Sequence, residues 1–270
     1  IMNGTCNYIL TVMKQSGRDF ADVLNEAQEL GYAESDPTFD VDGIDAAHKL
    51  AILSTLAFDT KVNVAGITLE GIDRVSIDDI RAAADMGYKI KLLGVAQQTA
   101  RGLEQRMQPC LVPAASPIGQ LEGGTNMVVL EGDAVEQIVL RGPGAGQGPT
   151  ASAVMGDICD IARGLRLPVF GQPAATLEAA QPAISALPAP FYWRRALRDK
   201  PGALAKVTAI LGNSEISIDR MRQYGHADGS APVLIVTHKT TRTALNEALK
   251  ALAATDVVST QPVALRIEHV

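Results

Sequence analysis

The feature that most constrains the fold of this chain is a proline- and alanine-rich stretch that divides the sequence into two parts. Proline lacks a backbone N–H and restricts the residue before it, so repeated prolines favour an irregular linker over helix or strand. The stretch contains Pro168, Pro173, Pro182, Pro188 and Pro190. A chain of 270 residues has room for two compact domains. We therefore expect one domain over residues 1–170, a linker over 171–189 and a second domain over 190–270.

The second part is predicted to fold as a ferredoxin-like βαββαβ domain. Its apolar runs and helical periodicities follow one another in the order strand, helix, strand, strand, helix, strand. The expected strands are 191–198, 216–224, 232–238 and 257–267, and the expected helices are 202–212 and 241–253.

The first part is predicted to be a mixed sheet with helices, which makes the whole chain an α+β protein. Strands outnumber the helices between them, and this favours an antiparallel or mixed sheet over a doubly wound one. Asp42 is expected to cap the third helix, and Pro149 to be the first residue of the last one. The expected helices are 7–15, 20–30, 42–58, 77–86 and 149–163, and the expected strands are 62–64, 90–96, 105–112, 126–131 and 134–140.

Charge and cysteine content exclude several classes of function. The net charge of -6 gives no general attraction to nucleic acid or to an anionic membrane. No apolar run approaches the length of about 18 residues that a membrane span needs. Cys6, Cys110 and Cys159 are far apart and lack a C-x-x-C spacing, so we expect buried free thiols, no metal site and a cytoplasmic protein.

The most informative segment is an acidic stretch in which five carboxylates fall within twelve residues, from Glu34 to Asp45. Asp45 and Lys49 are four positions apart at the start of a predicted helix, so their side chains should leave the same face. An aspartate there can hold the lysine in place, and a held lysine can exchange a proton with an alcohol oxygen. The spacing by itself equally fits an ordinary surface ion pair. A calcium loop is disfavoured, because the ligand alternation and terminal Glu of an EF-hand are missing.

The same stretch resembles the signature of the homoserine dehydrogenase family. The matching positions are Ala27, Gly31-Tyr32-Ala33-Glu34-Ser35-Asp36-Pro37, Asp40-Val41, Gly43, Asp45 and Lys49. Further similar blocks are Asn3-Gly4-Thr5, Asn7-Tyr8-Ile9-Leu10, Glu70-Gly71-Ile72, Gly87-Tyr88, Ile90-Lys91-Leu92-Leu93-Gly94, Gly142, Gly144-Ala145-Gly146 and Pro149-Thr150-Ala151. The resemblance spans residues 1 to about 170.

The resemblance implies NAD(P)-dependent interconversion of L-homoserine and L-aspartate 4-semialdehyde, in the biosynthesis of threonine, methionine and isoleucine. Lys49 matches the family's catalytic lysine, the expected proton donor, and Asp45 matches the acid that sets it up. Glu34 matches the residue that binds the substrate ammonium. The other expected substrate-pocket residues are Gly4, Thr5, Tyr32 and Asp40.

The glycine-rich loop 142–148 is not a dinucleotide-binding fingerprint, because the third glycine would fall on Gln147. From its spacing it is a tight strand-to-helix turn. The resemblance implies that Gly144 and Ala145 approach the nicotinamide end of NADP or NAD. No G-x-G-x-x-G unit occurs in the chain, and its first residues read as the middle of a protein. We therefore expect the main cofactor-binding domain to precede this segment, which alone should be inactive.

The segment Asp199-Lys200-Pro201-Gly202-Ala203-Leu204 joins the first strand and helix of the second part and resembles the ligand loop of an ACT domain. A helix start with a glycine favours an approaching carboxylate. Asp199, Gly202, Ala203 and Leu204 are the implied effector-binding residues, and threonine is the implied effector. A plain turn in a dimerisation domain remains an alternative.

Two further expectations concern the whole protein. The alternative to an enzyme is a non-catalytic amino-acid sensor attached to an incomplete dehydrogenase segment. The expected partners are a small-molecule substrate and further copies of the chain, as a homodimer or homotetramer, because sheets of this kind can pair across a two-fold axis.

Overall fold

The structure is a computed structural model that describes residues 1–198, 200–223, 230–256 and 263–269. The helices are α1 (Gly4–Ser16), α2 (Phe20–Glu29), α3 (Thr38–Val41), α4 (Ile44–Phe58), α5 (Ile77–Asp85), α6 (Gln147–Ala162), α7 (Ala203–Asn213) and α8 (Arg242–Ala253), with a 3₁₀ turn at Ala174–Thr176. The strands are β1 (Thr68–Leu69), β2 (Tyr88–Thr99), β3 (Gly102–Pro113), β4 (Thr125–Gly132), β5 (Glu136–Pro143), β6 (Phe191–Arg198), β7 (Ile218–Gln223), β8 (Ser230–Thr237) and β9 (Val263–Ile267).

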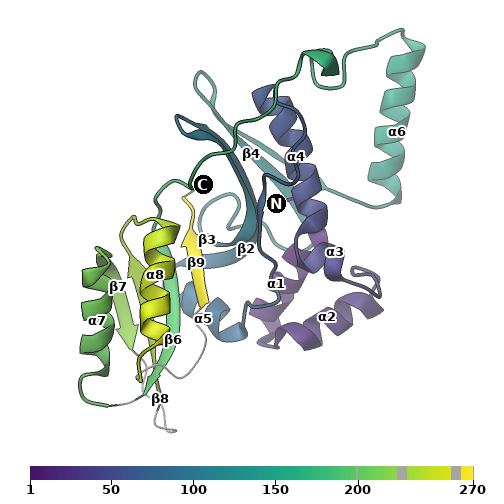
Figure 1. Cartoon of the computed structure of the whole chain (residues 1–270). Coiled ribbons are helices and arrows are strands. Elements are labelled where there is room, and N and C mark those ends of the chain that lie inside the picture. Colours follow the sequence, from purple (N-terminus) through teal and green to yellow (C-terminus); the bar gives the residue numbers. More distant parts are fainter. Residues whose placement is uncertain (199, 224–229, 257–262, 270) are drawn as a thin grey trace.

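The predicted α+β class is confirmed, with a mixed sheet in the first part and a βαββαβ order in the second. The two parts share one sheet of order β1-β3-β9-β6-β8-β7, and β2 pairs with β3 along its whole length. The joint lies where Cys110 and Leu111 of β3 pair in parallel with Arg266 and Ile267 of β9. The yellow strand β9 therefore lies beside the blue strand β3 in Figure 1, although 150 residues separate them in sequence.

Alternate residues of β6 serve two different cores. Phe191 and Trp193 pack with the apolar faces of α7 and α8. Tyr192, between them, points to the other face of the sheet and joins the core of the first part. Successive side chains of a strand point to opposite faces, so one strand can connect both cores. The second part is thus fastened to the first through its sheet face as well as through β9.

Two local expectations are wrong at the third helix and the strand expected over residues 62–64. Helix α4 begins after Gly43, which has a left-handed φ of 79°, while Asp42 ends the short helix α3 and does not cap α4. A Cβ at Gly43 would lie 3.2 Å from Met107 Cγ, so the tight break between the helices favours glycine. Residues 62–64 form no strand, because the Asn63 side chain accepts a hydrogen bond from the Gly66 N–H and closes a turn.

The hairpin of β4 and β5 and the helix α6 carry apolar side chains into solvent. None of the α6 residues is buried, and α6 stands away from the other helices in Figure 1. The exposed large apolar residues here are Leu130, Val135, Ile138, Val139, Leu140, Val154, Met155, Ile158 and Ile161. Cys159 of α6 is also exposed, which corrects the expectation that all three cysteines are buried. Pro149 is the third residue of α6 rather than its first, a position where the missing N–H still costs no helical hydrogen bond.

A buried carboxylate links the two parts. Asp79 of α5 is fully buried and completes a capping box with Ser76. From the second part, Arg194 Nε donates to Asp79 Oδ1 at 2.6 Å and the Tyr192 hydroxyl donates to the same oxygen at 3.2 Å. Removing one partner of such a buried pair leaves the other charge without compensation.

Replacing Asp79 by alanine is therefore expected to lower the free energy of unfolding by about 3–5 kcal/mol. Asp78 is the matched control: it is one residue away and mostly exposed, and its contacts with Arg81 and Arg194 are 3.7 and 3.9 Å long. Asp78→Ala should cost less than about 1 kcal/mol. Urea unfolding of the two variants measures the difference, and equal losses would contradict the proposed link.

Candidate active site

The predicted pairing of Asp45 and Lys49 is confirmed on the first turns of α4. Lys49 Nζ donates to Asp45 Oδ2 at 2.7 Å, and it also reaches the Met2 carbonyl at 3.3 Å. The Lys49 side chain is 48% exposed and that of Asp45 is 26% exposed. The ammonium is thus held from two sides while remaining open to a small molecule from solvent.

Asn3 connects this pair to a second carboxylate. Its side-chain Nδ2 donates to Asp40 Oδ1 at 2.7 Å and to Asp45 Oδ2 at 3.2 Å. Its Oδ1 accepts from the Cys6 N–H and caps α1. One amide therefore fixes the start of α1 against α3 and α4. The helix expected over residues 7–15 starts too late to include this cap, although asparagine is a favoured N-cap residue; the bridging role of Asn3 depends on three helix ends meeting.

The backbone beneath the pair is packed by apolar side chains of the sheet. The Cβ that a side chain at Gly94 would add lies 2.6 Å from Met107 Cε and 3.2 Å from Met2 Cε. Met107, on β3, also lies under Gly43 at the start of α4. Strand β3 thus supports both the helix that carries Lys49 and the segment whose carbonyl holds it.

Gly4, Thr5 and Tyr32 lie together at the start of α1. The Thr5 hydroxyl donates to the Tyr32 carbonyl at 2.7 Å, and the Tyr32 ring stacks on Tyr8 with centroids 4.3 Å apart. A Cβ at Gly4 would lie 2.9 Å from the Gly124 carbonyl oxygen, so this close approach favours glycine. The half-exposed Tyr32 ring therefore has a fixed place beside the loop before β4.

Glu34 lies in the turn between α2 and α3, with its side chain exposed. Its backbone carbonyl accepts from Gln28 Nε2 at 2.9 Å. Within the described residues its carboxylate makes neither a hydrogen bond nor an ion pair, so the structure does not bring it into contact with Asp45 and Lys49. The neighbouring His48 is also exposed, and its ring meets Phe39 edge-on at 5.6 Å.

The glycine-rich loop comes close to the same place through Asn126 of β4. A Cβ at Gly144 would lie 1.9 Å from Asn126 Nδ2, and this amide also reaches the Met2 carbonyl at 3.5 Å. Asn126 Oδ1 is buried and has no hydrogen-bond partner in the described part of the chain. Gly144 and Ala145 themselves are exposed. The Met2 carbonyl is therefore shared by the Lys49 ammonium and by the residue against which Gly144 packs.

A second lysine, Lys91 of β2, anchors the loop that faces Gly4. Its buried ammonium donates to Asn7 Oδ1 at 2.8 Å and to the Leu121 carbonyl. Asn7 in turn donates to the Gly123 carbonyl at 2.6 Å. Burial, and then repulsion by Lys89, lower the pKa of Lys91 to about 8. The lysine lies within a family-like block, but its role follows only from the fold.

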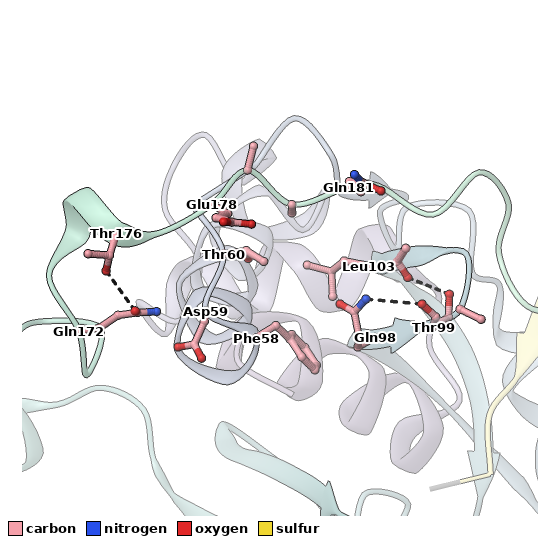
Figure 2. A pocket seen from close by; sticks show the side chains of 14 residues that line it. Phe58, Asp59, Thr60, Gln98, Thr99, Leu103, Gln172, Thr176, Glu178 and Gln181 are labelled. Atoms are coloured by element: carbon pink, nitrogen blue, oxygen red, sulfur yellow. Dashed lines mark hydrogen bonds between the residues drawn. The ribbon is translucent and has the colours of Figure 1, made fainter.

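Three further findings concern metal ligands, membrane spans and cavities. The described residues contain no group of three or more His, Cys, Asp and Glu placed to hold a metal ion. No described helix is both long and apolar enough to cross a membrane. A cavity of about 610 Å³ lies elsewhere, at the far end of α4 (Figure 2).

The predicted effector loop lies at the start of α7. Gly202 has a φ of 83° and precedes the helix, Ala203 is buried and Leu204 packs partly into the core. Asp199, the remaining predicted residue, lies outside the described residues. Nearby, Lys200 and Lys206 contact the Asp256 carboxylate at 3.3 and 2.9 Å.

Comparison with known proteins gives the same two parts. The model of the homoserine dehydrogenase family matches residues 1–159, and the ACT domain model matches residues 196–256. The homoserine dehydrogenase of Neisseria gonorrhoeae is 41% identical over 99% of this chain and 63% of its own length. The homoserine dehydrogenase of Pseudomonas aeruginosa is 42% identical over 100% of this chain and 64% of its own length.

Solved structures of homoserine dehydrogenases match the fold of the whole chain. A homoserine dehydrogenase from Thiobacillus denitrificans superposes with a TM-score of 0.91 at 40% identity, over 100% of this chain and 63% of that protein. The S. aureus homoserine dehydrogenase superposes with a TM-score of 0.75 at 27% identity, over 100% of this chain and 64% of that protein. The chain thus spans a little under two thirds of the length of these relatives.

The lowered pKa of Lys91 predicts a pH dependence of stability. Between pH 8 and the ordinary lysine value of 10.5, the unfolded chain keeps the proton that the folded chain has lost, so stability rises with pH. The slope approaches about 1.4 kcal/mol per pH unit. Urea unfolding of the wild type and of Lys91→Met from pH 7.5 to 10.5 tests this. Parallel curves would contradict a buried, titrating lysine.

Proposed function

This chain belongs to the homoserine dehydrogenase family, and from that premise we propose that residues 1–170 form the substrate-binding and catalytic part of an enzyme that interconverts L-homoserine and L-aspartate 4-semialdehyde with NAD(P). The observation that carries this proposal is the Lys49 ammonium, held by Asp45 and the Met2 carbonyl and open to solvent. The reaction would serve threonine, methionine and isoleucine biosynthesis. The free cysteines agree with a cytoplasmic setting.

We assign Lys49 as the proton donor to the alcohol oxygen that forms when the aldehyde is reduced. A protonated lysine is suited to this direction, because negative charge develops on that oxygen. The reverse direction needs a neutral lysine or a relaying water. Asp45 and Asn3 fix the position of the amine, and the second carboxylate bound to Asn3, Asp40, keeps the local potential negative.

For substrate binding we propose Glu34, Gly4, Thr5 and Tyr32. The free carboxylate of Glu34 suits a substrate ammonium, since charge-assisted hydrogen bonds are the strong ones. The hydrogen bond from the Thr5 hydroxyl to the Tyr32 carbonyl and the close contact between the Gly4 and Gly124 backbones give the pocket a fixed wall on the side of α1. Because Glu34 lies on an exposed turn, we expect it to move toward the substrate on binding.

The residues around Asn126 fit the end of a nicotinamide cofactor. A buried amide oxygen without a partner needs a hydrogen-bond donor, and Gly144 packs so closely on this amide that a side chain there would displace it. We propose that Gly144 and Ala145 approach the nicotinamide there, while a preceding domain of the full protein holds most of the cofactor. The cofactor, when bound, supplies or accepts the hydride. The choice between NAD and NADP would be made in that domain.

Replacing Lys49 by alanine in the full-length enzyme is expected to lower kcat by about 10²–10⁴-fold, the usual contribution of a general acid. Cofactor affinity should stay the same, because the lysine acts on the substrate oxygen. Steady-state kinetics together with cofactor titration by fluorescence measure both quantities.

His48→Ala is the matched control, since it truncates the preceding residue of the same helix, an exposed side chain whose ring meets Phe39 edge-on. It should retain kcat within about twofold. Full turnover in Lys49→Ala, or an equal loss in both variants, would refute the assignment of Lys49.

For residues 190–270 we propose an amino-acid-sensing role, with threonine as effector at the loop before α7. The positive φ at residue 202 favours glycine, and without a side chain there the start of the helix, where backbone N–H groups favour a carboxylate, stays open. A non-catalytic sensor is the alternative for the whole chain, and binding data separate the two functions.

Gly202→Leu is expected to abolish threonine binding measured by calorimetry, because leucine adds bulk and strains a left-handed backbone by about 1–2 kcal/mol. Glu34→Ala should leave threonine binding unchanged and weaken the binding of homoserine. The reverse pattern would move the threonine site to the substrate pocket.

We also propose that the full protein is a homodimer or homotetramer. The apolar residues of the β4–β5 hairpin and α6 would be covered by other protein surface in that assembly, because exposed patches of this kind mark association sites. Light scattering of the full-length protein measures the oligomeric state, and a monomer at all concentrations would contradict the proposed assembly.

A further inference from the structure

The cavity of about 610 Å³ lies under the segment that leads toward the second part (Figure 2). Three elements line it and leave it open to solvent: the C-terminal end of α4, the turn between β2 and β3, and residues 172–181. Its size is that of small-molecule sites. In Figure 2 the segment arches over Thr60 and Leu103, which come from the other two walls.

The overlying segment is fixed at both ends of the cavity by backbone hydrogen bonds. The Lys61 N–H donates to the Glu178 carbonyl at 2.7 Å, and the Leu103 N–H donates to the Gln181 carbonyl at 2.8 Å. Gly102 permits the second contact, since a Cβ there would lie 2.5 Å from the Gln181 oxygen. The cavity is therefore part of the fold, formed between two fixed contacts.

The charge in the cavity is negative. Asp59 and Glu178 line it, and within the described residues neither carboxylate takes part in an ion pair. Neither lysine nor arginine is among the described lining residues. Asp59 also ends α4, so the negative end of the helix dipole adds to the two carboxylates.

The rest of the lining offers hydrogen bonds and a small apolar surface. Gln98, Thr99 and Gln172 contribute amides and a hydroxyl, and Phe58 and Leu103 contribute apolar area. Figure 2 places Asp59 and Glu178 on the Gln172 side and Gln98 and Thr99 on the other. A short chain with an ammonium at the acidic side and a polar or ammonium group at the opposite end matches this arrangement.

We propose that this cavity is a binding site for a small organic cation carrying one or two primary ammonium groups. The site is separate from the reaction centre: Asp59 follows Lys49 by ten residues, or about 15 Å along the axis of α4. Ligand bound there would tie the segment before β6 to α4 and to the β2–β3 turn. Its binding would not compete with substrate.

The test is calorimetric titration of the full-length protein with 1,4-diaminobutane, with butane-1,4-diol as the uncharged probe of equal length. The diamine is expected to bind at least about tenfold more tightly than the diol, and its affinity should fall as salt is added. Equal binding of the two probes, or no binding of the diamine, overturns the proposal.

Neutral variants of nearly the same shape locate the site. Asp59→Asn and Glu178→Gln together should weaken diamine binding by about tenfold or more. Asparagine tolerates the left-handed conformation of residue 59, with its φ of 54°, so the end of α4 is preserved. Glu29→Gln, at an exposed acid outside the cavity, is the matched control and should bind as the wild type.

A filling variant separates shape from charge. Ala179→Trp places a bulky ring among the lining residues without changing the charge, and should also abolish binding of the diamine. Melting curves of every variant confirm folding. Unchanged affinity in the double neutral variant, or the same loss in Glu29→Gln, overturns the assignment of the site. Because the readout is binding at residues far from Lys49, its failure leaves the proposed reaction untouched.

Discussion

The pairing of β9 with β3 is the constraint on which the rest of the structure depends. It makes one sheet of two parts that the proline-rich segment separates in sequence. Strand β3 also carries Met107, which packs beneath Gly43 and Gly94 and so supports α4. The strand that receives the last strand of the ACT domain is therefore the strand on which the Lys49 helix rests.

The site itself is a set of shared acceptors. Asp45 Oδ2 receives both Lys49 and Asn3, and the Met2 carbonyl receives both Lys49 and Asn126. Each shared atom joins two elements that are distant in sequence, so the lysine is held by the meeting of α1, α4 and β4. Such sharing fixes the position of the lysine without burying its ammonium, as the proposed role of proton donor requires.

Much of this could be predicted from residue patterns. The helical spacing of Asp45 and Lys49 specified a contact that the structure has, because residues four apart share one helix face. Strands β6, β7, β8 and β9 fall on the expected stretches 191–198, 216–224, 232–238 and 257–267, of which residues 224 and 257–262 lie outside the described residues. Errors arose at two places: the Asn63 side chain made a turn of a short apolar run, and the left-handed backbone of Gly43 broke the segment that Asp42 was expected to cap. The turn at Asn63 is local, since its donor and acceptor are three residues apart, whereas the break at Gly43 depends on packing against Met107 from a distant strand.

The sequence by itself determined most of the longer helices and strands, the family and the Asp45–Lys49 pair, since these patterns lie in the chain itself, although α3 and β1 were not expected. Only the tertiary structure decided that Asn3 bridges two carboxylates, that Lys91 is buried beneath the loop facing Gly4, and that Asp79 joins the two parts. It also created the acidic cavity, whose walls come from residues 58–60, 98–103 and 172–181. The physical reason is that hydrogen bonds and burial act between atoms close in space, whatever their separation along the chain.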